Sequence, residues 1–171
     1  MKFSRNRPWL FDRKGSELNL SGAAMGQLLR GVLEKGASCR FRATGLSMYP
    51  FIKDGDVLTV SPLKGFFPRF GEVVAFTQPE TGKLVVHRVI GKRRSIYLIR
   101  GDNAHNPDGF LSKDNILGWV SRVERGGRSV SLHPGPARFF LALLNRTGLL
   151  SWLLFLMLRI IRSFKRGPAL E

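Results

Sequence analysis

Two short segments of this chain carry residue types that together could perform nucleophilic catalysis. The first is the turn-rich stretch Thr44-Gly45-Leu46-Ser47-Met48-Tyr49-Pro50, and the second, further along, is Val85-Val86-His87-Arg88-Val89. A serine hydroxyl is a weak nucleophile near neutral pH, so it needs a base within hydrogen-bond reach and donors aimed at the developing oxyanion. A histidine ring with an unperturbed pKa of about 6.5 can accept the serine proton. We therefore consider Ser47 as a nucleophile and His87 as its general base.

The segments around these residues predict a mainly β, hairpin-rich domain that would position them. From Cys39 to Leu132 the chain consists of short runs of β-forming residues separated by Gly, Pro and Asp. Such runs at regular spacing indicate strands joined by tight turns. The expected strands are residues 57–60, 72–76, 84–90, 95–100, 116–123 and 128–132.

One short amphipathic helix is expected before the β region. Apolar side chains recur there at helical spacing, at Met25, Leu28, Leu29, Val32 and Leu33. Ser21 is a suitable N-cap, and Gly36 suits a C-terminal cap. The pattern therefore predicts a helix that starts near Ser21 and ends before Gly36.

The length of 171 residues suits one compact domain with appendages. We expect a basic N-terminal arm over residues 1–20, a catalytic β domain with its leading helix over 21–133, and an apolar segment with a basic tail over 134–171. The break Pro134-Gly135-Pro136 separates the last two parts. The N-terminus lacks an apolar run of the length that a signal peptide requires, so no cleavable export signal is expected.

Composition limits the partners and cofactors. Lys and Arg number 28 against 12 Asp and Glu, a formal charge of +16, which favours anionic lipid, nucleic acid or acidic peptides. The basic residues lack the aromatic interleaving of an RNA-recognition motif, so nucleic acid ranks last. Cys39 is the only cysteine, which excludes an intrachain disulfide. Its position relative to the three histidines shows no zinc-ligand spacing, so we expect no metal and no cofactor.

The C-terminal segment from Phe139 to Ile161 is apolar and predicts association with a membrane. It contains only two charged residues, Arg146 and Arg159, and as a helix it would be about 34 Å long, roughly one hydrocarbon thickness. Arg146 would cost about 2.5–3.5 kcal/mol near the bilayer centre, so an interfacial, re-entrant or oblique helix competes with a full span. Residues Trp152–Leu158 are apolar on every face. A helix packed on the domain or on a partner is the alternative.

Five motifs follow one another in the β region. They are Gly45-Leu46-Ser47-Met48-Tyr49-Pro50, Asp54-Gly55-Asp56-Val57-Leu58, Gly71-Glu72-Val73-Val74-Ala75-Phe76, Val86-His87-Arg88-Val89-Ile90, and Gly101-Asp102-Asn103 with Asp108. In this order they resemble the type I signal peptidases and their relatives, the self-cleaving SOS-type repressors, over roughly Phe41 to Glu124. The resemblance implies a β-rich serine peptidase whose substrate is a precursor peptide or protein.

The resemblance also assigns roles to individual residues. Ser47 matches the nucleophile, and His87 stands where most bacterial members have a lysine base, as in the endoplasmic-reticulum-type and archaeal-type signal peptidases. Asp108 resembles the aspartate that orients the histidine, and Asp102 is the competing candidate. A carboxylate on one ring nitrogen would fix the tautomer and stabilise the imidazolium.

The expected oxyanion site departs from the signal-peptidase pattern. Signal peptidases commonly show Ser-Gly-Ser-Met, in which the first serine contributes a hydroxyl, but here Gly45-Leu46 precede Ser47. The backbone amide of Ser47 is left as a donor, and the Thr44 hydroxyl is a candidate for a second one. Loss of one oxyanion donor costs about 10²–10³ in rate, so reduced or specialised activity is expected. The spelling Gly-Leu-Ser-Met is also closer to the repressor-type motif.

Three functions remain open from the sequence. The first is a serine endopeptidase of signal-peptidase type that cleaves a precursor at or near a membrane, with the side of the membrane undetermined. The second is a repressor-like peptidase that cuts itself or a partner, although one helix before the β region is too little for a helix-turn-helix domain. The third is a non-enzymatic basic module that binds anionic lipid or nucleic acid.

Overall fold

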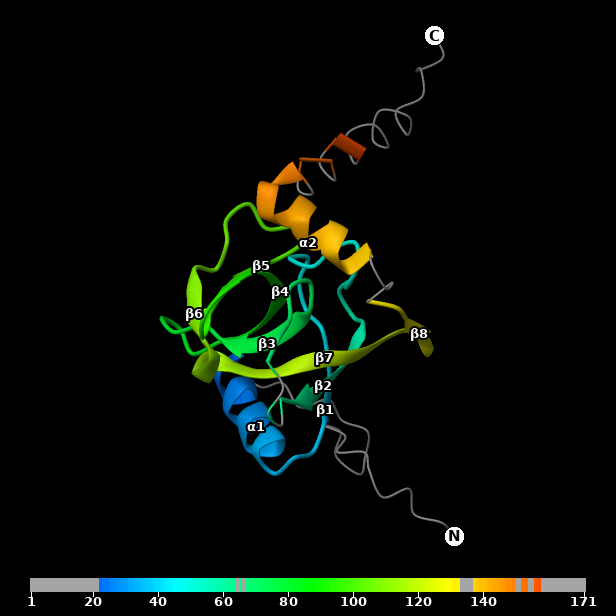
Figure 1. Cartoon of the computed structure of the whole chain (residues 1–171). Coiled ribbons are helices and arrows are strands. Elements are labelled where there is room, and N and C mark those ends of the chain that lie inside the picture. Colours follow the sequence, from blue (N-terminus) through cyan, green and yellow to red (C-terminus); the bar gives the residue numbers. More distant parts are fainter. Residues whose placement is uncertain are drawn as a thin grey trace.

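The computed structural model of the chain describes residues 22–63, 65, 67–132, 137–149, 152–153 and 156–157. These residues form one antiparallel sheet of eight strands and two α-helices (Figure 1), which confirms the mainly β fold with one helix near each end. In chain order the elements are α1 (Gly22–Glu34), β1 (Cys39–Arg42), β2 (Val57–Pro62), β3 (Val73–Thr77), β4 (Leu84–Arg93), β5 (Ile96–Arg100), β6 (Phe110–Ser112), β7 (Ile116–Arg125), β8 (Arg128–Val130) and α2 (Ala137–Thr147).

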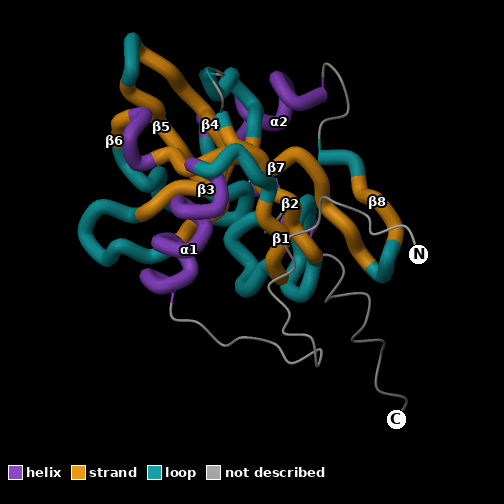
Figure 2. Tube along the Cα trace, turned by 90° about the horizontal axis from the view of Figure 1, so that it is seen from below, coloured by secondary structure: helices purple, strands orange, loops and turns teal. Residues whose placement is uncertain are grey.

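The strands are arranged in the order β1-β2-β7-β3-β4-β5-β6, and β8 pairs with β7. Figure 2 shows β7 between β2 and β3, and the β7–β8 hairpin extends to one side of the molecule. Strand β4 pairs with β3 from Leu84 to Arg88, but it pairs with β5 only from Arg88 onward. The first half of β4 therefore has one edge without a strand partner among the described residues.

The six expected runs overlap strands β2, β3, β4, β5, β7 and β8. Strands β1 and β6 were not among them. In β1 the sequence Cys39-Arg40-Phe41-Arg42 places two arginines in a strand of four residues, and β6 has only three residues. Segments this short and this polar carry little periodic signal, so pairing with β2 and β5 is what defines them as strands.

The sheet separates two hydrophobic cores. Because successive side chains of a strand point to opposite faces, Val73 and Ala75 of β3 belong to the first core, whereas Val74 and Phe76 belong to the second. The first core contains Leu29 and Leu33 of α1 together with strands β2 and β7. The second contains Val89 of β4, Tyr97 and Ile99 of β5, and Leu111 of β6.

Helix α1 ends as the sequence predicts. Gly36 has φ of 76°, which favours glycine, and its N–H donates to the Leu33 carbonyl oxygen at 2.9 Å. The predicted N-cap, Ser21, lies outside the described residues. Gly26 is buried against the β3–β4 hairpin. A Cβ at this position would lie 3.1 Å from Thr77 Cγ2, so the absence of a side chain lets the helix approach the hairpin closely.

Helix α2 is the described beginning of the apolar C-terminal segment. Ala142 and Asn145 are fully buried, and the ring of Phe139 stacks on Phe70 with centroids 6.4 Å apart. The helix packs on β4, as Figure 1 shows. No helix in the described part of the chain has both the length and the apolar character needed to cross a membrane. The basic arm over 1–20 and most of the segment after Leu149 lie outside the described residues.

Candidate active site

Ser47 lies in an exposed turn between β1 and β2. The turn is closed by hydrogen bonds from the Tyr49 N–H to the Leu46 carbonyl and from the Ile52 N–H to the Met48 carbonyl, at 3.1 and 2.9 Å. Before it, Gly45 has φ of 92°, a left-handed conformation in which any other residue would be strained. This sharp bend presents Ser47 at the surface while Met48 is buried.

Two carboxylates hold the ends of this turn. Asp54 Oδ1 accepts a hydrogen bond from the Gly45 N–H at 2.8 Å. Asp56 accepts the Lys53 N–H and forms a two-point ion pair with Arg125, from Nε at 2.8 Å and from Nη2 at 2.7 Å. Burial opposes ionisation of Asp56, but these hydrogen bonds and the charge of Arg125 outweigh it and lower the pKa of Asp56. The Asp56 carboxylate, whose ionised form these partners favour, therefore links the turn to β7.

The imidazole of His87 is paired with a carboxylate. His87 lies in β4 and is buried, and its Nδ1 is 2.6 Å from Asp108 Oδ2. The Asp108 loop is fixed by a hydrogen bond from the Asp108 N–H to the Ile99 carbonyl at 2.9 Å. Beside the ring, Phe76 packs at a centroid distance of 6.1 Å. Because the Asp108 carboxylate accepts a hydrogen bond from Nδ1–H, the ring proton stays on Nδ1 and Nε2 is left free as a proton acceptor.

Gly101 is the point where the Ser47 turn and the His87 ring meet. A Cβ added at Gly101 would lie 2.7 Å from the Ser47 carbonyl oxygen and 2.9 Å from His87 Nε2. Ser47 and the accepting nitrogen of His87 are therefore neighbours across the bare backbone of Gly101. The next residues fasten this contact, because the Asn103 N–H donates to the Ser47 carbonyl at 2.8 Å and Asn103 Nδ2 donates to the Leu46 carbonyl at 3.2 Å.

Asp102, the competing candidate for the orienting acid, has a different partner in the structure. Both of its oxygens accept hydrogen bonds from Arg88, from Nε at 2.8 Å and from Nη2 at 2.7 Å, and both side chains are fully buried. Arg88 Nη1 also donates to the Gly71 carbonyl at 2.8 Å. The carboxylate that contacts the His87 ring is that of Asp108, while Asp102 and Arg88 form a buried ion pair beneath it.

A cavity of about 250 Å³ opens beside Ser47. Ser47, Gly45 and Thr44 form one wall, and apolar side chains form most of the rest. These side chains come from β1 and the residue after it, from β2, from the start of β4 and from the base of the turn: Phe41, Ala43, Met48, Ile52, Leu58, Leu84, Val85 and Val86. Arg42 of β1 also lines the cavity. The cavity is therefore bounded by β1 and by the part of β4 that lacks a second strand partner. The apolar part of its lining suits an apolar side chain.

Thr44 and the Ser47 amide, the expected oxyanion donors, both lie at this cavity. Thr44 is exposed, and no group of the described chain accepts a hydrogen bond from its hydroxyl or from the Ser47 N–H. Such unengaged donors at the cavity mouth can receive the oxygen of a bound carbonyl.

Other reactive groups do not compete with Ser47. Cys39 is buried, and burial raises the pKa of its thiol, which suppresses the reactive thiolate. His105 is exposed. No cluster of three or more potential metal ligands occurs among the described residues.

One residue of the site region was not found from the sequence. Asn145 of α2 is fully buried, and its Nδ2 donates to Asp102 Oδ1 at 3.0 Å. In the sequence it lies within the apolar C-terminal segment. It is an uncharged polar residue three positions after the small Ala142, and this pattern could have indicated a buried polar contact. A polar side chain on the buried face of an apolar helix needs a partner.

These features describe a β-rich protein in which an exposed serine turn lies against a His–Asp pair, an arrangement suited to a serine peptidase. The comparison with family models gives the family: the model described as Peptidase S24-like matches residues 19–123, well over half of the chain. The chain belongs to this family, which supports a serine peptidase or a self-cleaving, repressor-like function. A comparison with curated proteins gave no match.

Proposed function

We propose that this chain is a serine endopeptidase of signal-peptidase type that cleaves a precursor peptide or protein, with Ser47 as nucleophile, His87 as base and Asp108 as the orienting acid. The observation that carries the proposal is the 2.6 Å contact between His87 Nδ1 and Asp108 Oδ2, on a ring whose Nε2 lies against the Ser47 turn. A histidine held in this way has its tautomer set for general-base catalysis.

The substrate binds as an extended strand between β1 and the first half of β4. Both have an edge without a strand partner in the described chain, and an extended peptide can use such edges for backbone hydrogen bonds. Alternate side chains of the peptide point in opposite directions, so the residue before the scissile bond enters the cavity next to Ser47. The apolar side chains of that cavity favour an apolar residue at that position.

Acylation begins with the attack of Ser47 Oγ on the scissile carbonyl carbon, while His87 Nε2 takes the hydroxyl proton. The Ser47 and His87 side chains form no hydrogen bond to each other in this structure, so this bond forms as the substrate settles. The Ser47 N–H and the Thr44 hydroxyl donate to the oxyanion of the tetrahedral intermediate. When the C–N bond breaks, His87 Nε2–H passes its proton to the leaving amine.

Deacylation repeats these steps with water as the nucleophile. His87 Nε2 takes a proton from the water, and the hydroxide attacks the ester carbon of the acyl-Ser47 intermediate. Collapse of the second tetrahedral intermediate returns the proton to Ser47 Oγ and releases the carboxylate product. Throughout, the Asp108 carboxylate stabilises the protonated ring without taking its proton.

Labelling of the full chain with a fluorophosphonate tests the nucleophile. Ser47 Oγ should displace fluoride from phosphorus, and peptide mass spectrometry should find the phosphonyl group on Ser47 in the folded protein but not after denaturation. A mixture of peptides should then be cut by the unlabelled protein and not by the labelled one. Unlabelled Ser47 in a protein that still cuts the peptides would contradict the proposal.

The same samples distinguish an endopeptidase that cuts other chains from a repressor-like protein that cuts itself. Incubation of the chain alone, followed by intact mass measurement, would reveal a fixed internal cut if the chain is a repressor-like self-cleaving protein. An unchanged mass together with cleavage of added peptides supports the endopeptidase.

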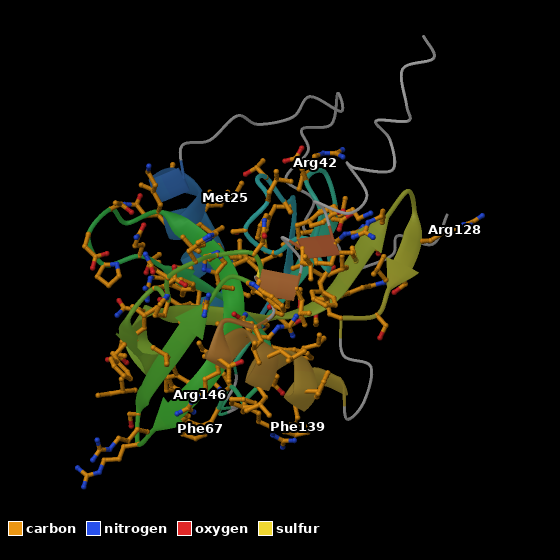
Figure 3. The ribbon with its side chains drawn as sticks, turned by 90° about the horizontal axis from the view of Figure 1, so that it is seen from above. Met25, Arg42, Phe67, Arg128, Phe139 and Arg146 are labelled. Carbon is orange, nitrogen blue, oxygen red and sulfur yellow. The ribbon has the colours of Figure 1, made fainter. Side chains whose placement is uncertain are left out.

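We also propose that the enzyme works at an anionic membrane surface, through α2 and its surroundings. Phe140 and Leu143 are 63% and 55% exposed, so they present apolar surface to solvent. Figure 3 draws Arg146, Phe139 and Phe67 along one edge of the molecule. Apolar side chains flanked by cations are typical of helices that lie in the headgroup region.

Cosedimentation with lipid vesicles tests this location. The wild type should bind vesicles rich in phosphatidylglycerol more than vesicles of phosphatidylcholine alone, because both the charge and the apolar face contribute. Phe140→Glu should weaken binding, whereas Phe110→Glu, at an even more exposed phenylalanine on β6, should not. Equal binding by the two variants would rule out α2 as the contact.

A further inference from the structure

Helix α2 sends one polar side chain, that of Asn145, into the region beneath the candidate active site. Asn145 is fully buried. Its Nδ2 donates to Asp102 Oδ1 at 3.0 Å and lies 3.4 Å from the Gly101 carbonyl oxygen. The C-terminal helix therefore reaches the loop that follows β5.

The loop of Gly101–Asn103 contacts both the Ser47 turn and the His87 ring. The backbone of Gly101 lies against His87 Nε2 and the Ser47 carbonyl, and the next amide but one, the Asn103 N–H, donates to the same Ser47 carbonyl. A shift of this loop changes the distance between Ser47 and His87. Misplacement by about 1 Å can cost on the order of 10² in rate.

Stability alone does not explain an asparagine at this position. Asn145 Oδ1 is buried and has no hydrogen-bond partner among the described residues, a cost of about 1–3 kcal/mol. The orientation of the amide is fixed, because a flip would point Oδ1 at the Asp102 carboxylate. In this orientation the amide nitrogen donates to Asp102 and Gly101, while the amide oxygen is left without a partner in the described chain.

Arg100 makes a second connection between α2 and the same loop. Its Nη1 donates to the Asn145 carbonyl at 2.8 Å, and its Nε and Nη2 donate to the Ala104 and His105 carbonyls at 2.9 and 2.8 Å. The last turn of the helix and the loop are therefore held at two points, one through the Asn145 side chain and one through its backbone.

We propose that Asn145 is a positioning residue of the peptidase site, through which α2 sets the geometry of the Gly101–Asn103 loop against Ser47 and His87. This inference rests on the proposed function of Ser47 and His87. It follows that the position of α2, whose outer face is exposed, regulates the catalytic step.

The kinetic test compares Asn145→Leu with Thr147→Val, the same kind of polar-to-apolar change at an exposed position two residues later on α2. Asn145→Leu should lower kcat on the order of 10-fold to 10²-fold and leave KM unchanged, because the cavity beside Ser47 is lined by other elements. Thr147→Val should keep the wild-type kcat. A wild-type kcat in a folded Asn145→Leu protein would overturn the proposal, as would an equal loss in both variants.

Asn145→Asp gives a second readout that a purely structural role would not change. An aspartate has no donor when ionised, but it regains one by taking up a proton, and the adjacent Asp102 carboxylate favours that proton. The rate of Asn145→Asp relative to wild type should therefore rise as the pH falls, while that of Asn145→Leu stays constant. Constant ratios for both variants would contradict the donor role.

NMR separates this inference from the proposed function. The amide signals of Gly101 and Asn103 and the ring signals of His87 should shift in Asn145→Asp and not in Thr147→Val, whether or not a peptide is cut. If these signals shift but the wild type cleaves nothing, the proposed function fails, while the coupling of α2 to the Gly101–Asn103 loop stands. If the wild type cleaves and the signals do not shift, the positioning role fails.

Discussion

Replacing Ser47 by alanine should abolish peptide cleavage and leave the fold intact. Ser47 is exposed in its turn and no hydrogen bond of the turn uses its side chain, so its hydroxyl contributes little to stability. His87→Ala should remove activity to a similar degree, on the order of 10⁴–10⁶ in kcat, because nucleophile and base act as one unit. The double variant should be no worse than either single one, a non-additivity that steady-state kinetics on all three proteins measures.

Two matched variants control this experiment. Ser95→Ala and His105→Ala change the same residue types at exposed positions outside the site and should cleave like the wild type. Circular dichroism and thermal unfolding should be alike in all five variants. A Ser47→Ala protein that cleaves at the wild-type rate would show that another group is the nucleophile.

The two aspartates should differ in the kind of damage that their loss causes. Asp108→Asn should lower kcat by about 10⁴ at nearly unchanged stability, because an amide at Nδ1 no longer holds the ring in the tautomer that leaves Nε2 free. Asp102→Ala should instead lower the free energy of unfolding by about 3–5 kcal/mol, because it leaves the fully buried Arg88 guanidinium without its carboxylate.

Denaturant unfolding and peptide cleavage, measured on the same preparations, distinguish the two outcomes. An Asp108→Asn protein with wild-type kcat would remove Asp108 from the catalytic group. An Asp102→Ala protein as stable as the wild type would show that the ion pair with Arg88 contributes nothing to the fold.

The sequence predicts the local features of this fold well, for physical reasons. The short β-forming runs of β3 and β4 and the left-handed glycine after α1 are encoded within a few residues. Long-range partners are not encoded locally. Arg88 is buried, unlike an arginine on the surface of a strand, because its guanidinium pairs with Asp102. No spacing rule selects Asp108 over Asp102 as the residue that contacts His87.

The C-terminal segment shows a related limit. Its apolar composition is compatible with a lipid environment and with packing on the domain, and the choice depends on which face meets the sheet. In the described part, Ala142 and Asn145 face the domain and Leu143 faces solvent. That distribution was not readable from composition, because Asn145 gains its buried partner only when β5 and the following loop are in place.

The ion pair between Asp56 and Arg125 can form only late during synthesis of the chain. These residues are 69 positions apart, and Asn145 bonds to Asp102 across 43 positions, so neither contact can form until the later residue has left the ribosome. Contacts of such large sequence separation form late in folding. A nascent chain therefore carries Ser47 and His87 long before it can hold them in working geometry.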